Sequence, residues 1–244
     1  MRDDGDNSNY NSMQMTISRR VVSGLSLTGN YTWSRALDTS SGSPQDSYNA
    51  RTDYGLSSVH RAHLLNVNYI YELPFFRHGD NAVLRHTVGG WELAGVTTYQ
   101  SGAPSSIVVT SDVARIGASS SRASLIANPN LSAGERTLTR WFNTEAALPP
   151  ERMTQGVFGT GGRNILIGPG FNQWDLSAIK NFDIREHTRL QFRAESFNVV
   201  NHPSFTGIDT TARFDAAGKP TGTYGAVTGA GPARVLEFGL KLIY

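Results

Sequence analysis

The chain has 244 residues, of which 39% are hydrophobic, 10% aromatic and 17% charged, with a formal net charge of +2 and an isoelectric point near 9.0. The absence of cysteine excludes disulfides and thiol chemistry, and the absence of any run of about 18 apolar residues predicts no transmembrane helix. The basic residues are scattered rather than gathered on one element, so we expect no nucleic acid among the partners. A mean hydropathy of -0.32 with abundant Tyr, Phe and Gly is typical of a membrane β-barrel, in which only every second residue faces lipid.

Residues 1–9 are polar, and we expect them to form a leader or loop before the first strand. The segment contains no apolar stretch of the kind found in secretory signal peptides. A protein of the bacterial outer membrane requires such a signal. Either the barrel interpretation is wrong, or this chain is the C-terminal part of a longer protein, with residues 10–244 forming part of a β-barrel; the strands described next favour the second.

Alternation of apolar and polar side chains with a period of two predicts antiparallel strands along much of the chain. The clearest case is residues 25–34, where apolar or glycine positions alternate with small polar ones without exception. Ten tilted residues of this kind are enough to cross a bilayer. The predicted strands cover residues 10–20, 25–34, 60–73, 89–109, 173–182, 188–201 and 234–244.

The segment Gly102-Ala103-Pro104 leaves two interpretations open, because Pro interrupts a strand at either a bulge or a turn. A bulge gives about seven strands, and a hairpin gives about eight. Only the first keeps a regular alternation of long outer loops with short inner turns, as bacterial barrels have. We therefore favour seven strands, an odd number that predicts an open arc of a larger barrel.

The connections of this seven-strand arrangement divide into two kinds. Long polar segments are predicted to be extracellular loops, and short segments are predicted to be periplasmic turns. The predicted extracellular loops cover residues 38–59, 110–172 and 207–233, and the predicted inner connections cover residues 21–24, 74–88 and 183–187. Residues 110–172 form the largest of the loops.

The end of the chain alternates so regularly, up to a final aromatic residue, that we expect it to lie in a sheet. It resembles the C-terminal signal by which outer-membrane barrels are recognised for insertion. Glu237, Gly239, Leu242 and Tyr244 fill the positions of that signal. The resemblance implies outer-membrane lipid and the barrel-assembly machinery as partners.

Eight short motifs follow one another along the chain, and the resemblance that they carry covers about residues 10–244. These motifs are residues 31–38, 60–65, 90–95, 100–104, 162–164, 168–170, 175–177, and 192–198 with 201–203. Together they resemble the C-terminal barrel portion of TonB-dependent outer-membrane receptors, in particular the Oar-like group with a carboxypeptidase-regulatory-like N-terminal domain. The resemblance implies an all-β, antiparallel barrel of about 22 strands in the bacterial outer membrane that imports a ligand. TonB would act only through a plug that lies outside this sequence.

The residues themselves leave other functions open. A lipid-facing wall with long polar outer loops also fits a porin-like channel or a surface adhesin without a plug. A third possibility is a soluble β-sandwich lectin, whose aromatic residues would face a core about 10 Å thick.

The sequence offers no acid, base and nucleophile at a recognisable spacing, so we do not expect an enzyme. We expect no cofactor and no metal site. His60 and His63 are the one close histidine pair, and a strand would direct them to opposite faces. Arg189, Gln191, Arg193 and Glu195 alternate along the strand predicted at 188–201, and we expect them to form a charge ladder with neighbouring strands in the lumen.

The unknown ligand is expected to bind in the loop at residues 110–172, which is long and rich in Asn, Ser, Arg and Gly. The candidate contacts are Arg140, Trp141, Phe142, Arg163 and Asn164. The alternative is that residues 137–143 form a packed turn that holds the loop down, because loops of this length commonly fold on themselves.

Overall fold

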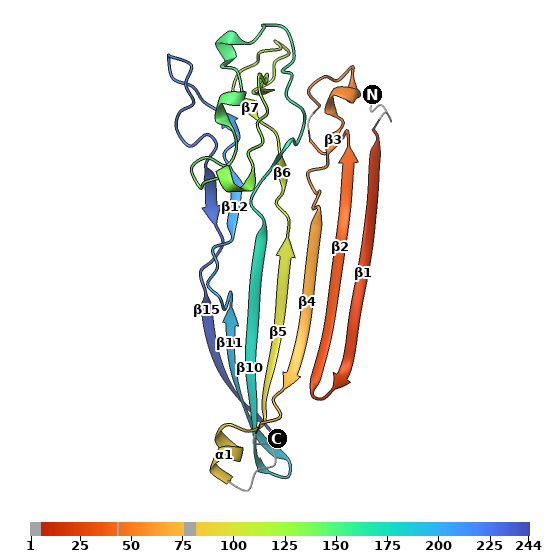
Figure 1. Ribbon diagram of the computed structural model, residues 1–244, viewed down its shortest axis with the longest axis vertical. Coiled ribbons are helices and arrows are strands. Elements are labelled where there is room, and N and C mark those ends of the chain that lie inside the picture. Colours follow the sequence, from red (N-terminus) through yellow and green to blue (C-terminus); the bar gives the residue numbers. More distant parts are fainter. Residues whose placement is uncertain (1–5, 43, 76–81) are drawn as a thin grey trace.

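A computed structural model describes residues 6–42, 44–75 and 82–244. Its main feature is a sheet of long antiparallel strands, side by side in chain order (Figure 1). The order is β1 (Ser8–Val22), β2 (Leu25–Asp38), β4 (His63–Glu72), β5 (Trp91–Gln100), β10 (Phe171–Arg185), β11 (Thr188–Phe197) and β15 (Val235–Ile243). A two-residue strand, β3 (Gly55–Leu56), also pairs with β2. The fold is therefore all-β, and the prediction of seven long strands is confirmed.

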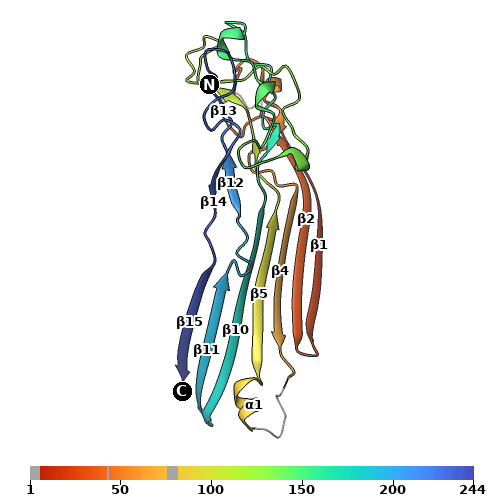
Figure 2. The same ribbon diagram turned by 60° about the vertical axis from the view of Figure 1, so that its left-hand side comes forward.

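The remaining elements are short, and most of them lie beyond one end of the long strands. The short strands are β6 (Pro104–Ser105), β7 (Val108–Val109), β8 (Ser121–Arg122), β9 (Leu166–Ile167), β12 (Phe205–Ile208), β13 (Thr211–Ala212) and β14 (Val227–Ala230). The 3-10 helices are η1 (Ala50–Asp53), η2 (Ala133–Glu135), η3 (Thr144–Ala146) and η4 (Pro150–Arg152). We call the loops at this end, residues 39–62, 101–170 and 198–234, the cap (Figure 2).

The opposite end of the sheet carries tight connections and α1 (Ala82–Thr87) (Figure 1). Ser23 and Gly24 form the turn between β1 and β2 with φ values of 53° and 79°, as a two-residue hairpin requires. In the parts of the chain that the structure describes, no helix has both the length and the apolar character needed to cross a membrane.

Some strand ends differ from the prediction. β1 begins at Ser8 rather than Tyr10, so the polar leader predicted for residues 1–9 is shorter, and its first five residues lie outside the described part of the chain. β11 ends at Phe197 rather than Asn201. The cause is local, because Asn198 and Asn201 have φ values of 54° and 51° and form a turn in which the Asn198 amide donates to the His202 carbonyl at 3.0 Å.

The segment at Gly102 is an interruption within one continuing pair of strands and not a hairpin. Gln100 of β5 is opposite Phe171 of β10. Pro104 of β6, four residues after Gln100, is opposite Ile167 of β9, four residues before Phe171. The register is therefore the same on both sides of the interruption. The backbones approach closely there, so that a Cβ on Gly102 would lie 1.9 Å from the Gly168 carbonyl oxygen.

This close approach predicts that Gly102→Ala destabilises the protein by about 1–3 kcal/mol, because the two backbones must separate to admit the methyl group. Thermal unfolding of the purified protein in detergent measures the effect. Gly134→Ala is the matched control, since a Cβ at Gly134 meets nothing within 4 Å. Equal unfolding midpoints for the two variants would contradict the prediction.

The long sheet has one apolar and one polar face. On the apolar face, register places Phe192 opposite Leu240, and the Phe192 ring lies 6.0 Å from that of Trp91 and 6.4 Å from that of Phe238. On the polar face, Arg189 pairs with Asp183 at 3.0 Å.

Of the expected charge ladder, Arg189–Asp183 is a charge pair between neighbouring strands, and two further polar contacts lie on the same face. The Gln191 amide donates to Asn181 at 3.0 Å, and Arg193 pairs with Glu195 at 3.3 Å. Gln191, Arg193 and Glu195 lie on the same face as Arg189, because every second residue of a strand points to the same side of the sheet.

The apolar face also holds a buried cation among its aromatic rings. Lys180 lies opposite Trp91 and Phe192, and its ammonium group lies 5.7 Å from the ring centroid of Trp91 and 5.3 Å from that of Phe182. The ammonium group donates to the Gly89 carbonyl, and only 3% of the residue is exposed. Lys180 is thus enclosed by aromatic rings near the hairpin end of the sheet.

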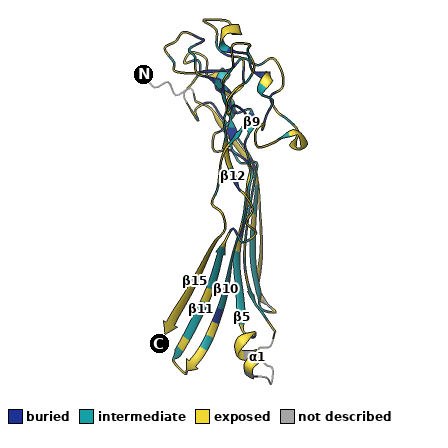
Figure 3. Ribbon diagram, turned by 90° about the vertical axis from the view of Figure 1, so that its left-hand side faces the viewer, coloured by how far each residue is buried: buried dark blue, intermediate teal, exposed yellow. Residues whose placement is uncertain are grey.

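The hydrophobic core lies in the cap rather than on the long sheet. Figure 3 shows most of the long strands as intermediate or exposed, with buried segments gathered in the cap. The core cluster comprises Ile107, Val109, Val113, Ala123, Phe142, Ala147, Met153, Leu166, Ala212 and Tyr224. Because these residues come from two separate loops, residues 101–170 and 198–234, the cap is a folded unit and not a set of independent loops.

Candidate functional site

The turn at residues 137–143 is packed into the cap. Thr137 and Arg140 exchange backbone hydrogen bonds at 2.9 and 3.2 Å. The indole N–H of Trp141 donates to the Ile167 carbonyl at 2.8 Å, and the Arg136 guanidinium lies 5.6 Å from its ring centroid. The structure therefore has the packed turn that was the alternative to a ligand-contacting loop.

Among the candidate ligand contacts, Phe142 is the side chain that the structure buries most completely. It is 1% exposed, and its ring meets the edge of the Tyr224 ring at a centroid distance of 5.3 Å. A side chain so buried serves packing and offers no surface to a ligand. Arg140 is exposed at the turn, away from the cavity described below.

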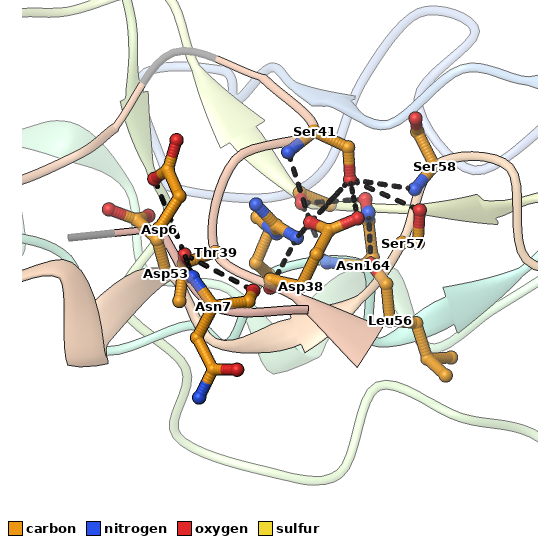
Figure 4. Close-up of polar contacts among 12 residues, drawn as sticks. Asp6, Asn7, Asp38, Thr39, Ser41, Asp53, Leu56, Ser57, Ser58 and Asn164 are labelled. Atoms are coloured by element: carbon orange, nitrogen blue, oxygen red, sulfur yellow. Dashed lines mark hydrogen bonds and ion pairs between the residues drawn. The ribbon is translucent and has the colours of Figure 1, made fainter. Parts of the chain in front are cut away.

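Arg163 and Asn164, the other two candidates, lie where the largest loop meets the loop that follows β2. The Arg163 guanidinium forms an ion pair with the Asp38 carboxylate and donates to the Asp38 carbonyl at 2.6 Å. The Asn164 amide donates to the Leu56 carbonyl at 2.6 Å, and its backbone N–H donates to Ser106 Oγ at 2.8 Å. Figure 4 shows Asp38, Ser41 and Asn164 within one hydrogen-bonded cluster.

This cluster borders a cavity of about 460 Å³ in the cap. Its lining combines hydroxyl, amide and charged side chains with a few apolar ones: Ser41, Gly42, Pro44, Gln45, Asp53, Ser106, Val108, Ala114, Ile116, Ala118, Ser119, Ser120, Ser121, Arg122, Phe158, Arg163 and Asn164. Ser119 and Ser120 are exposed, so the cavity opens to solvent beside them. The volume is within the range of about 300–1,000 Å³ typical of small-molecule sites.

A second buried ion pair forms part of the cavity wall. Arg122 Nη1 lies 3.2 Å from Asp53 Oδ1, and the two side chains are 8% and 2% exposed. Arg122 Nε donates to Gln45 Oε1 and Nη2 donates to the Thr52 carbonyl, each at 2.8 Å. Burial lowers the pKa of Arg122 from its ordinary value, and the adjacent Asp53 carboxylate opposes that shift.

This second pair could not be predicted from sequence. Arg122 and Asp53 lie on loops far apart in the chain, and neither sits in a short motif. Gln45, which joins them, is 77 residues from Arg122. Only the folding of one loop against another brings the three side chains together.

The histidines do not converge on a common point. His60 Nδ1 accepts a hydrogen bond from the backbone N–H of Ala36 at 3.2 Å, and His63 Nδ1 lies 2.8 Å from the Tyr31 hydroxyl. Burial, followed by the charges of Arg61 and Arg35, lowers the pKa of His60. Across residues 6–42, 44–75 and 82–244, no group of three or more His, Asp or Glu side chains could hold a metal ion.

The residues proposed as an insertion signal lie on or just after β15. Glu237, Gly239 and Leu242 lie opposite Glu195, Arg193 and Leu190 of β11, and Tyr244 follows the strand and is 96% exposed. In the sheet order β15 is a terminal strand. Its role in insertion stays a prediction.

Comparison with known families gives one match. A family model described as an outer membrane beta barrel domain matches residues 1–237, which include nearly all of the long sheet and the whole cap. Comparisons with curated proteins and with solved structures give no significant match.

Proposed function

Because the chain belongs to the outer membrane β-barrel domain family and is therefore located in the bacterial outer membrane, we propose that it forms part of the wall and the outer loops of a TonB-dependent import receptor. The observation that carries this proposal is the folded cap, which places a polar cavity beyond the end of a two-faced membrane wall. A receptor needs a ligand site on its outer side, and the cap offers one. The proposed role is structural and ligand-binding rather than catalytic.

The two faces of the wall support transport. The apolar face, with its aromatic rings, suits lipid, and the face with the Arg189–Asp183 and Arg193–Glu195 pairs suits a water-filled lumen. Long loops belong on the extracellular side of bacterial barrels and short turns on the periplasmic side. The cap is therefore extracellular in this proposal.

The positions of the receptor-like motifs support the finer assignment. Residues 100–104 and 168–170 form the two sides of the close approach at Gly102. Residues 31–38 end at Asp38, which pairs with Arg163 in the motif at residues 162–164. Motifs that are far apart in sequence thus meet at structural junctions, as features of one family fold would.

An adhesin is the alternative that the cap itself favours to some degree, because large apolar side chains are exposed on it. Tyr48, Val59, Ile126 and Leu138 are the main examples. A porin-like channel without a plug is distinguished from a receptor by its permeability.

Conductance and growth together test the proposal. The full-length protein, purified from its own outer membrane, is expected to show no constitutive conductance in planar bilayers, because a plugged receptor is closed at rest. Deleting its gene and deleting tonB are expected to cause the same growth defect on at least one nutrient. Constitutive conductance supports the channel instead, and loss of surface attachment without any shared growth defect supports the adhesin.

A further inference from the structure

We propose that the cap cavity binds a neutral, hydroxyl-rich ligand of the size of a short oligosaccharide. The inference deepens the proposed function and rests on it for the fate of the ligand. Binding itself requires only the cavity and its lining.

The charges around the cavity balance. Arg122 is paired with Asp53 and Arg163 with Asp38, and all four residues are at least about nine-tenths buried. Arg122, Arg163 and Asp53 line the cavity, and Asp38 neutralises Arg163 from outside the lining, so the two ion pairs together carry no net charge. An anionic ligand would gain little attraction there and would lose its hydration, so the balance favours an uncharged ligand.

The hydrogen-bonding groups suit hydroxyls. Serine hydroxyls both donate and accept hydrogen bonds, as do the hydroxyls of a sugar, and Ser119 and Ser120 of the lining are exposed at the mouth of the cavity. Arg163 Nε is buried and has no hydrogen-bond partner within the described structure. A buried N–H without an acceptor is unfavourable, and an oxygen of a bound ligand is one acceptor that would satisfy it.

The cavity also has an apolar side. Phe158, Val108, Ala114 and Ile116 belong to its lining. A sugar ring combines a polar rim with an apolar C–H face, and an aromatic side chain provides a flat apolar surface for such a face. A purely apolar ligand would cover the exposed serine hydroxyls without offering them a hydrogen-bond partner, which disfavours binding.

Titration calorimetry on the full-length protein in detergent tests the ligand class. The probes are maltotriose, cellotriose, xylotriose and triacetylchitotriose, with trigalacturonate as an acidic sugar and trialanine as a peptide. We expect at least one neutral trisaccharide to bind with one site per chain and more tightly than trigalacturonate or trialanine. Tighter binding of either comparison probe, or no binding of any neutral sugar, overturns the proposal.

Two serine substitutions locate the site. Ser120→Trp fills the exposed mouth of the cavity and is expected to weaken sugar binding by at least about tenfold. Ser47→Trp is the matched control, because Ser47 is exposed and does not line the cavity, and it is expected to leave binding unchanged. Equal affinities for the two variants place the sugar elsewhere and overturn the proposal.

Phe158 gives a second test that does not depend on blocking the mouth. Phe158→Ala is expected to weaken sugar binding by about tenfold, and Phe158→Tyr, which keeps the ring, is expected to restore it. If Phe158→Ala and Phe158→Tyr bind the sugar with equal affinity, the Phe158 ring does not contact it, and the proposed site is wrong.

The binding experiments also separate this inference from the proposed function, because they need neither TonB nor a proton-motive force. Absent sugar binding with an intact TonB-dependent growth phenotype overturns the site alone. If the protein binds a sugar but its growth phenotype does not depend on TonB, the binding site stands and the proposed import function is wrong.

Discussion

Phe142→Ala is expected to lower the free energy of cap unfolding by about 3–5 kcal/mol, as is usual when a buried phenylalanine is truncated. Phe142 is 1% exposed and packs against Tyr224 within a core drawn from two separate loops. The cavity left by the ring cannot be filled from one loop alone. The long strands are held by their own backbone ladders, so the loss is expected in the cap only.

Proteolysis of the purified protein under native conditions measures this loss, because cleavage follows the population of the open form when reclosing is fast. The expected change is about a 100- to 5,000-fold faster cleavage within the cap. Leu138→Ala is the control, since Leu138 is in the same turn but 51% exposed, and it should change the rate little. Cleavage of the two variants at similar rates would show that Phe142 is not part of the cap core.

Asp53→Asn is the second substitution with a large expected effect. It leaves the Arg122 guanidinium buried without a counter-charge, and breaking a buried pair in this way costs about 3–5 kcal/mol. The asparagine oxygen can still accept the hydrogen bond that the Gln45 backbone N–H donates to Asp53, so the substitution removes mainly the charge. The same proteolysis assay measures the result.

Asp183→Asn provides the matched control for the loss of a carboxylate. Asp183 also pairs with an arginine, Arg189, but the two side chains are 76% and 53% exposed, and an exposed pair contributes at most about 1 kcal/mol. Arg122→Met combined with Asp53→Asn is expected to recover part of the stability, because no uncompensated charge remains. A double variant less stable than Asp53→Asn would contradict the proposed cause.

The long strands could be predicted from sequence because their signal is local. Alternation with a period of two is visible within ten residues, as in residues 25–34, and it also predicts which residues share a face. The end of β11 was missed because Asn198 and Asn201 adopt positive φ, a conformation that the alternation does not report. The same alternation resolved the choice between seven and eight strands only when it was combined with loop lengths.

The cap was beyond this kind of prediction. Its contacts join residues such as Arg122 and Gln45, which are 77 positions apart, and no pattern within one loop reveals its partner in another. Trp141 and Phe142 were candidate ligand contacts because aromatic residues in a polar loop suggest recognition. In the structure they hold the loop together, while the charged residue of the same candidate set that borders a cavity is Arg163.

Lys180 has a consequence for how the protein sits in the bilayer. Its ammonium group is held at the Gly89 carbonyl between the rings of Trp91 and Phe182, close to the hairpin end of the sheet. A shift of the wall by one residue along the strands moves this group by about 3.4 Å. A shift toward the cap side carries the ammonium group toward the hydrocarbon. A lysine on the lipid face costs up to about 2–4 kcal/mol at the midplane. A shift in the opposite direction takes the neighbouring rings out of the membrane–water interface, which aromatic side chains prefer. The buried Lys180 thus opposes displacement of the wall along the membrane normal, and with it any change in the distance between the cap and the bilayer.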